Sequence, residues 1–329
     1  MLKNRSVLAA RPRAIITGIC GFTGPHLARL LVSQGLDVVG VDRAAPTRAL
    51  DELRPRVAVE NVDLCDGAAL EGALKRARPD YIFHLACQCK SDDPAQLWAS
   101  NVLATENLLW AAARSARHAK IFVPGSAAEI GIVRPDELPI TESQPLRPIS
   151  LYGLTKAAQI LRVLAYGYTS ELQVFVGRPF NLVGPDLPDA MVCAAIASQL
   201  VAIERGRRPA VIRVACTTTE RDFVDVRDAV QAYWAIVTRG RAGEVYNVCG
   251  GRGTRIEGVV TKLVRLATVP VEVRVEAARV RRDDIPRSIG DPSKLRSETG
   301  WRPEISLEDS LVGVMESWRA RRTDGLACA

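Results

Sequence analysis

The sequence predicts an α/β protein with a doubly wound parallel sheet, followed by a smaller C-terminal α/β lobe. Short apolar runs rich in Val and Ile alternate with amphipathic segments, which is typical of parallel βαβ units. A glycine-rich turn follows the first of these runs. The alternation weakens after Arg178, where prolines become frequent. We therefore expect one large first domain and a smaller lobe that is interleaved with its last strands.

The elements of the first domain follow from this alternation. The apolar runs predict strands at Ala14–Thr17, Asp37–Val41, Val57–Val62, Tyr81–Ala86, Lys120–Pro124 and Leu172–Gly177. The amphipathic segments predict helices near 24–35, 66–77, 94–116 and 150–170, and another at Ala190–Arg205. We assign residues 1–180 and returning segments at about 211–249 to the first domain, and about 181–210 and 250–329 to the smaller lobe.

Composition excludes several classes of protein. The chain has 329 residues, of which 47% are hydrophobic and 25% charged, as in soluble globular proteins and unlike disordered or fibrous ones. Its apolar runs are far shorter than the roughly 20 residues that span a bilayer, so we expect no membrane partner. Segment 1–13 is basic, but its apolar run is too short for a secretory signal, and a cytoplasmic location is the default expectation. Aromatic residues make up only 5% and do not interleave with the basic runs, which argues against nucleic acid as a partner.

The eight cysteines are scattered, without a CxxC pair or a histidine at metal-ligand spacing, so we expect reduced thiols and no metal site. Cys87 and Cys89 suggest a redox or nucleophilic role. Because neither has a paired base nearby in the sequence, small loop thiols are the preferred interpretation.

A dinucleotide site is indicated at the first strand-to-helix turn. Gly18, Gly21 and Gly24 follow the first strand, and glycines there let backbone amides approach a pyrophosphate at the helix N-terminus. Asp42 ends the second strand about 20 residues downstream, where a carboxylate can accept hydrogen bonds from a ribose. The adjacent Arg43 suits a 2′-phosphate, so the cofactor is NADP or NAD, with Asp42 favouring NAD.

A second constellation indicates proton transfer. Tyr152 and Lys156 are four residues apart on a predicted helix, so both side chains share one face and the ammonium can favour ionisation of the phenol. This would bring a pKa that is normally about 10 toward the working pH. Ser126 follows an earlier strand, where its hydroxyl can hydrogen-bond a substrate carbonyl.

The order of these motifs resembles the extended short-chain dehydrogenase/reductase superfamily, in its nucleotide-sugar-modifying branch. The motifs are the glycine turn, Asp42, Asp63 with Leu64, residues 84–86, residues 101–105, Ser126, Tyr152 with Lys156, and residues 178–181. Within that superfamily the chain is most similar to the GDP-4-keto-6-deoxy-D-mannose reductases, which make GDP-rhamnose. The narrower resemblance is carried by residues 178–185, 221–228, 243–252, 291–296 and 299–303, several of which epimerases and dehydratases share.

The resemblance implies a role for each motif. Ser126, Tyr152 and Lys156 would be catalytic. The cofactor would contact Gly18, Gly21, Phe22, Thr23, Gly24, Asp42, Arg43, Asp63, Leu64, Leu85, Ala86, Asn101, Tyr152 and Lys156. The nucleotide sugar would contact Asn181, Arg221 and Arg281, with Arg282 competing for the last role. The helices near 94–116 and 150–170 would pair two chains into a homodimer.

The implied reaction is NAD(P)H-dependent reduction of the C4 ketone of a nucleotide-linked 4-keto-6-deoxy sugar, with GDP as the expected nucleotide. A nucleotide-sugar 4-epimerase that retains NAD is the alternative, and a non-catalytic dinucleotide-binding sensor is a more distant one. A 4,6-dehydratase is disfavoured, because the glutamate that such enzymes carry two positions after the hydroxyl residue is Ala128 here. Glu129 is displaced by one residue, which in an extended segment points its side chain to the opposite face unless the turn is irregular.

Overall fold

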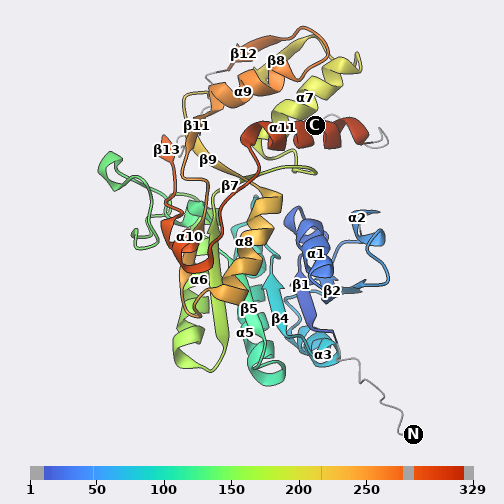
Figure 1. The fold of residues 1–329 in the computed structure, drawn as a ribbon, viewed down its shortest axis with the longest axis vertical. Helices are drawn as coiled ribbons and strands as arrows, with labels where there is room; N and C mark the ends of the chain where they lie inside the picture. The colour runs from blue at the N-terminus through green and yellow to red at the C-terminus, as the bar shows by residue number, and fades with distance from the viewer. Residues whose placement is uncertain (1–10, 47, 216, 277–284, 322–329) are drawn as a thin grey trace, which may run out of the picture.

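The computed structural model describes residues 11–46, 48–215, 217–276 and 285–321. Seven parallel strands form the main sheet in the order β10-β6-β5-β4-β1-β2-β3, and a smaller lobe lies beyond one end of it (Figure 1). The strands are β1 (Arg13–Thr17), β2 (Asp37–Asp42), β3 (Val57–Asn61), β4 (Tyr81–His84), β5 (Lys120–Pro124), β6 (Gln173–Pro179) and β10 (Val245–Val248). The fold class predicted from the sequence is confirmed.

Helices cover both faces of this sheet, so its strands are apolar on both sides. On β1, Ala14 and Ile16 pack into the core under α1 (Thr23–Ser33) and α8 (Val226–Arg239), whereas Ile15 points to the opposite face. That face is covered by α3 (Gly67–Ala77), α5 (Ala104–Ser115) and α6 (Leu151–Thr169). This double burial accounts for the continuous apolar runs in the sequence.

The predicted helix near 94–116 is not one regular helix. It consists of α4 (Pro94–Trp98), a π-helical turn (Ala99–Leu103) and α5. The π-helical turn contains the buried side chain of Asn101. Such turns insert an extra residue into a helix and are frequent at functional sites.

The lobe has its own core. Its helices are α7 (Val192–Glu204), α9 (Ile256–Arg265) and α11 (Leu307–Ala320), which pack together on β8 (Val211–Val214). β8 pairs with β12 (Glu272–Val275), and a second small sheet contains β7 (Asn181–Val183), β9 (Glu220–Asp225), β11 (Gly253–Arg255) and β13 (Arg287–Ser288). The remaining helices are α2 (Arg48–Asp51) and α10 (Ser293–Thr299), with short 3₁₀ turns at Ala127–Glu129 and Pro135–Glu137.

The structure departs from the expected course of residues 211–249. Only α8 and β10 of this segment join the main sheet and its helices, because β8 and β9 pair with strands of the lobe. Conversely, α10 lies in the expected lobe segment but packs on α8 and β10, and Leu295 and Trp301 enter the core of the main sheet. Strand pairing, which the apolar pattern does not specify, decides both differences.

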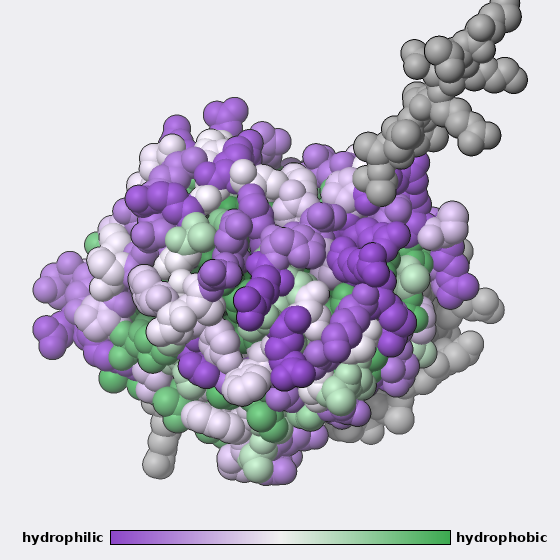
Figure 2. All heavy atoms as spheres, turned by 90° about the horizontal axis from the view of Figure 1, so that it is seen from below, coloured by the Kyte–Doolittle hydropathy of each residue, from purple (hydrophilic) through white to green (hydrophobic). Residues whose placement is uncertain are grey.

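Over the described residues, every helix falls short of the length and apolar character that crossing a membrane requires. The face seen from below in Figure 2 is mostly hydrophilic, with small apolar patches between charged side chains.

Candidate active site

The predicted site residues gather at the carboxyl ends of the parallel strands, on the side of the main sheet that faces the lobe (Figure 1). The loops after β1, β4 and β5 and the start of α6 all reach this edge. In open α/β sheets, ligands bind in the crevice at this edge.

The glycine turn has a geometry that only glycine permits. Gly18 has φ +70°, and a Cβ atom there would lie 2.6 Å from the Cα of Ala86, in the loop after β4. At Gly24 a Cβ atom would lie 2.2 Å from the carbonyl oxygen of Ile19. The turn therefore packs tightly against the neighbouring loop and against the first turn of α1.

The start of α1 suits an anionic ligand. Phe22 is its N-cap residue and Thr23 its first residue, and among the described residues no side chain caps this end. The first amide groups of the helix therefore lack a side-chain partner, and the helix dipole favours negative charge there. Together with the constrained glycines, this arrangement fits the pyrophosphate of a dinucleotide.

The residues predicted to contact adenosine lie at the ends of β2 and β3, which are neighbours in the sheet. The carboxylate of Asp42 accepts hydrogen bonds from the backbone amides of Cys20 at 2.8 Å and Ala44 at 2.9 Å. Asp42 thus also holds the glycine turn, a role that the sequence did not reveal. A guanidinium nitrogen of Arg43 lies 3.7 Å from a carboxylate oxygen of Asp63, and both side chains are exposed. Leu64 is buried beside them.

Replacing Gly18 by alanine is expected to weaken dinucleotide binding and to lower the free energy of unfolding. The added methyl group would have to displace the backbone of Ala86, and the left-handed conformation would be strained as well. Gly35→Ala is the matched control, because Gly35 has φ +89° but has no atom within 4 Å of the added Cβ. Titration with NADPH and chemical denaturation of both variants test this. Equal losses of dinucleotide affinity would contradict a specific role for the glycine turn.

Ser126, Tyr152 and Lys156 are brought together by a close approach of two elements. Ser126 caps the 3₁₀ turn after β5, and Ser150 caps α6 by accepting the amide of Gly153 at 3.0 Å. A Cβ atom at Gly153 would lie 2.3 Å from the carbonyl oxygen of Ala128. This glycine lets the first turn of α6 touch the 3₁₀ turn, so that the Tyr152 phenol hydrogen-bonds Ser126.

The phenol of Tyr152 does not have the lowered pKa that the sequence predicts. Burial raises its pKa well above the ordinary value, and the neighbouring thiols of Cys87 and Cys89 add to this, while the Ser126 hydrogen bond opposes it. Lys156 is 1% exposed, and its ammonium donates to the carbonyl oxygen of Pro124 at 2.6 Å and to the side-chain oxygen of Gln159. The ammonium is thus held by these acceptors. The phenol keeps its proton at neutral pH, which suits a proton donor.

Lys156 is positioned by a buried polar network. The Gln159 amide donates to the Thr105 hydroxyl at 2.7 Å, and the ring of His84 bridges the hydroxyls of Thr105 and Thr17 at 2.9 and 2.8 Å. Burial, together with the charge of Lys156, lowers the pKa of His84 to about 3. His84 is therefore neutral and orients the network, as expected for a histidine outside the chemistry.

Glu129 is not available as a base. The turn after Ser126 is a 3₁₀ helix instead of an extended segment, and it directs the Glu129 side chain inward. Its carboxylate is 0% exposed, accepts the Ser126 amide at 3.0 Å and pairs with Arg178 on β6 at 2.6 Å. The irregular turn therefore supplies a buried ion pair in place of the proton-transferring glutamate of a dehydratase.

Asn101 lies in the π-helical turn and connects the loop after β4 to α6. Its side chain accepts the Gln88 amide at 2.8 Å, donates to the Gln88 carbonyl at 2.9 Å and donates to the Thr155 hydroxyl at 3.0 Å. Leu85 and Ala86 precede this loop and are half-buried. The sequence predicts Asn101 in the site, but it does not reveal that Asn101 holds the loop that carries two neighbours of Tyr152.

Those neighbours are Cys87 and Cys89, whose side chains lie beside the predicted catalytic residues. Their thiols hydrogen-bond each other, and that of Cys89 also hydrogen-bonds the Tyr152 phenol. Two residues far along the chain influence these thiols: Tyr152 contacts Cys89, and the charge of the Lys156 ammonium lowers the pKa of Cys87. In the sequence, the only indication that these cysteines lie in the site is their CxC spacing directly after a strand.

The predicted substrate residues lie in the small sheet of the lobe. Asn181 on β7 is paired with Phe223 on β9, and Arg221 lies two residues before Phe223. Side chains alternate along a strand, so Arg221 and Phe223 lie on the same face of β9. Asn181 is in register with Phe223 and therefore lies on that face as well. Arg281 and Arg282 lie outside the described residues.

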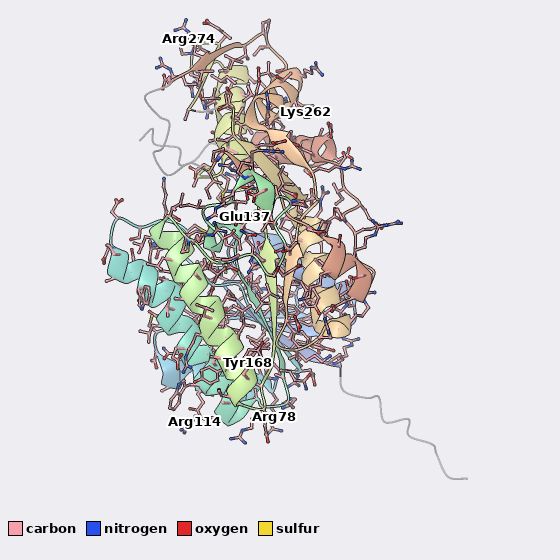
Figure 3. All side chains as sticks on the ribbon, turned by 90° about the vertical axis from the view of Figure 1, so that its left-hand side faces the viewer. Arg78, Arg114, Glu137, Tyr168, Lys262 and Arg274 are labelled. Atoms are coloured by element: carbon pink, nitrogen blue, oxygen red, sulfur yellow. The ribbon has the colours of Figure 1, made fainter. Side chains whose placement is uncertain are left out.

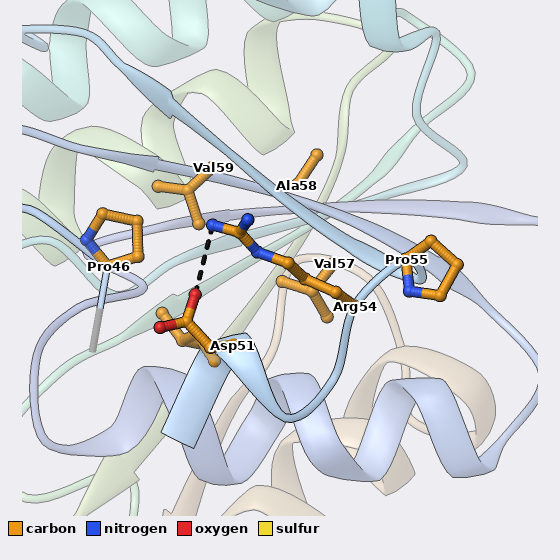
Figure 4. A pocket seen from close by; sticks show the side chains of 8 residues that line it. Pro46, Asp51, Arg54, Pro55, Val57, Ala58 and Val59 are labelled. Atoms are coloured by element: carbon orange, nitrogen blue, oxygen red, sulfur yellow. Dashed lines mark ion pairs between the residues drawn. The ribbon is translucent and has the colours of Figure 1, made fainter. Parts of the chain in front are cut away.

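A separate surface pocket of about 360 Å³ lies at the edge strand β3, four strands away from β5 (Figure 4). It contains the ion pair between Asp51 and Arg54, 3.1 Å apart, together with Pro46, Leu50, Pro55, Val57, Ala58 and Val59. The pocket is therefore separate from the site that contains Ser126 and Tyr152.

Comparison with known proteins identifies the family of this chain. The family model described as GDP-mannose 4,6 dehydratase matches residues 15–313. GDP-6-deoxy-D-mannose reductase of Pseudomonas aeruginosa is 33% identical over 313 residues, which cover 94% of this chain and 98% of the relative.

Solved structures of nucleotide-sugar enzymes share the fold of this chain. RMD from Pseudomonas aeruginosa, complexed with NADPH, has a TM-score of 0.81 at 32% identity and covers 95% of this chain and 99% of its own. UDP-glucose 4-epimerase from Thermus thermophilus, complexed with NAD, has a TM-score of 0.83 at 26% identity and covers 94% of this chain and 99% of its own. NADPH and NAD are the two cofactors predicted from the sequence. The chain therefore belongs to the GDP-mannose 4,6-dehydratase family, within the NAD(P)-dependent extended short-chain dehydrogenases/reductases.

Proposed function

We propose that the protein reduces the C4 ketone of a nucleotide-linked 4-keto-6-deoxy sugar to an alcohol, with GDP-4-keto-6-deoxy-mannose as the substrate. The observation that carries this proposal is the pairing of a protonated Tyr152 phenol with Ser126, at an edge of the sheet that fits a dinucleotide. The 33% identity to GDP-6-deoxy-D-mannose reductase supports the choice of sugar and of GDP.

Each side chain of the site has a distinct task in this reaction. When bound, the reduced nicotinamide supplies the hydride. Ser126 and Tyr152 donate hydrogen bonds to the ketone oxygen, and these bonds strengthen as negative charge builds on that oxygen in the transition state. Tyr152 then gives its proton to the oxygen, and Lys156 holds the nicotinamide ribose while fixed by Pro124 and Gln159.

The lobe is proposed to hold the nucleotide. Asn181 and Arg221 share one face of its small sheet, and a guanidinium suits the two negative charges of a diphosphate. Asp42, Arg43, Asp63 and Leu64 would hold the adenosine of either NADP or NAD.

A 4-epimerase is the second candidate, because the solved epimerase shares the fold along nearly its whole length. An epimerase must first oxidise its substrate, which requires a phenolate at Tyr152. A reductase forms the same phenolate after it donates the proton, so this group does not separate the two reactions. The 33% identity to GDP-6-deoxy-D-mannose reductase, against 28% to UDP-glucose 4-epimerase, favours the reductase.

The test mixes purified protein with GDP-4-keto-6-deoxy-mannose and either NADPH or NADH, and follows loss of the reduced nicotinamide absorbance. The proposal expects oxidation in proportion to the sugar consumed, with the faster rate identifying the preferred cofactor. A lack of oxidation with both cofactors, combined with a retained nucleotide that does not exchange, would favour the epimerase.

We also propose a homodimer formed by the faces of α5 and α6, which run side by side in Figure 3. Large apolar side chains are exposed on α4, the π-helical turn, α5 and α6: Trp98, Leu103, Trp110, Leu154, Leu161 and Tyr168, at 44%, 46%, 57%, 47%, 58% and 79% of their areas. Apolar exposure of this kind marks interaction surfaces. A cytoplasmic location remains part of the proposal.

Leu161→Glu is expected to convert the dimer to a monomer, because the variant would bury a charge in the proposed interface. Ile132→Glu is the matched control, since Ile132 is 53% exposed but lies outside these helices. Light scattering coupled to size-exclusion chromatography reports the mass of each variant. A wild-type monomer, or a dimer that survives Leu161→Glu, would contradict this interface.

A further inference from the structure

The loop after β4 holds two cysteines in a fixed position next to Tyr152. Asn101 binds both main-chain groups of the intervening Gln88, at 2.8 and 2.9 Å. Asn101 is in turn bonded to Thr155, whose hydroxyl donates to the carbonyl oxygen of Tyr152 at 2.9 Å. One connected set of hydrogen bonds therefore sets the loop against the helical turn that carries the phenol.

We call these hydrogen bonds between Asn101 and Gln88 the Asn101 clamp; they fix the backbone between the two cysteines. The thiols of Cys87 and Cys89 hydrogen-bond directly, and Cys89 also hydrogen-bonds the Tyr152 phenol. Both cysteines are exposed, so small solutes can reach them. The reduction mechanism uses neither thiol.

The two sulfurs differ in charge. The hydrogen bond from Cys89 and the nearby ammonium of Lys156 outweigh desolvation and lower the pKa of Cys87 to about 6. The same contact raises the pKa of Cys89 far above its ordinary value. At neutral pH the pair is thus one thiolate and one thiol, which is the arrangement of a nucleophile with its resolving partner.

The other described thiols lack this arrangement. Burial and the neighbouring Asp42 raise the pKa of Cys20 to about 11, and burial and Asp63 raise that of Cys65. Burial also raises the pKa of Cys193 to about 12. Selective reactivity is therefore expected at the loop after β4.

We propose that Cys87 and Cys89 form a peroxide-reactive dithiol whose oxidation to a disulfide inactivates the neighbouring site. The thiolate of Cys87 attacks one oxygen of hydrogen peroxide, the O–O bond breaks, and the departing hydroxide takes up a proton to become water. The Cys89 sulfur then attacks the resulting sulfenic acid, the S–O bond breaks, and a second water leaves. Two thiols lose two electrons and two protons, and one peroxide is reduced to two waters.

The disulfide would remove the thiol that contacts Tyr152 and draw Cys87 and Cys89 together on either side of Gln88, whose backbone Asn101 holds. The loss of turnover rests on the proposed function, whereas formation of the disulfide does not. The two can therefore fail independently.

The experiment treats the full-length reduced protein with hydrogen peroxide and compares wild type with Cys87→Ser, Cys89→Ser and the control Cys65→Ser, which alters an exposed thiol outside the pair. Mass spectrometry of the peptide containing both cysteines is expected to show loss of two hydrogens in wild type and in Cys65→Ser. Cys89→Ser should stop at a sulfenic acid that dimedone traps, and Cys87→Ser should yield neither product at this peptide. Turnover of wild type, relative to the untreated protein, should fall by about tenfold or more and recover with dithiothreitol.

Oxidation of Cys65 at the same rate as Cys87, or a disulfide that leaves turnover unchanged, would overturn the proposal. If untreated protein shows no reductase turnover, the proposed function fails, and the peptide masses alone then decide whether the dithiol exists.

Discussion

Replacing Tyr152 by phenylalanine is expected to lower the turnover number by about 100- to 10,000-fold, with little change in dinucleotide affinity. The variant removes the proton donor and one of the two hydrogen bonds to the developing alkoxide, but it keeps the aromatic ring. Lys156 keeps its acceptors, Pro124 and Gln159, because neither contact involves the phenol. The ribose-binding group should therefore stay in place.

Tyr168→Phe is the matched control. Tyr168 lies at the opposite end of the same helix from Tyr152, outside the site, so loss of its hydroxyl should leave turnover unchanged. Steady-state kinetics and calorimetric titration with NADPH measure both effects. Undiminished turnover in Tyr152→Phe would show that another group supplies the proton.

Replacing Arg178 by methionine is expected to cause the largest loss of stability, about 3–5 kcal/mol. Arg178 and Glu129 are 3% and 0% exposed and 2.6 Å apart, so the variant leaves a buried carboxylate without its charged partner. The same carboxylate holds the amide of Ser126, and the loss is therefore expected to reach the catalytic turn. Arg178 also donates to the side chain of Asn247 at 3.3 Å.

Urea denaturation measures the change in the free energy of unfolding. Arg274→Met serves as the control, because Arg274 pairs with Glu272 in the lobe with both side chains more than half exposed, and solvent screens such pairs. We expect no measurable change in the free energy of unfolding of Arg274→Met. A similar small effect in Arg178→Met would mean that the Glu129 carboxylate finds another partner or takes up a proton.

The main sheet was predictable because its strands are buried on both faces. β1, β2 and β5 begin and end within one residue of the predicted bounds, because each contains a short apolar run, and those of β1 and β5 end directly at a glycine or proline turn. The glycine turn and the pair Tyr152 and Lys156 were found for a similar reason. Both depend on spacing within a single element or a single turn.

Features that depend on distant residues were not predictable. The inward turn of Glu129 depends on Arg178, which lies 49 residues later. The contact of Cys89 with Tyr152 depends on the Asn101 clamp and on the close approach of Gly153 to Ala128. The high pKa of Tyr152 arises from burial, which helical spacing alone does not report.

The central claim is that hydride reaches C4 of the sugar and that the proton comes from Tyr152. The most direct measurement supplies cofactor deuterated at the transferred position of the nicotinamide, together with GDP-4-keto-6-deoxy-mannose, and locates deuterium in the product by NMR. The reductase account predicts one deuterium at C4 for each cofactor oxidised. Product without deuterium at C4, formed while the added cofactor stays reduced, would contradict it.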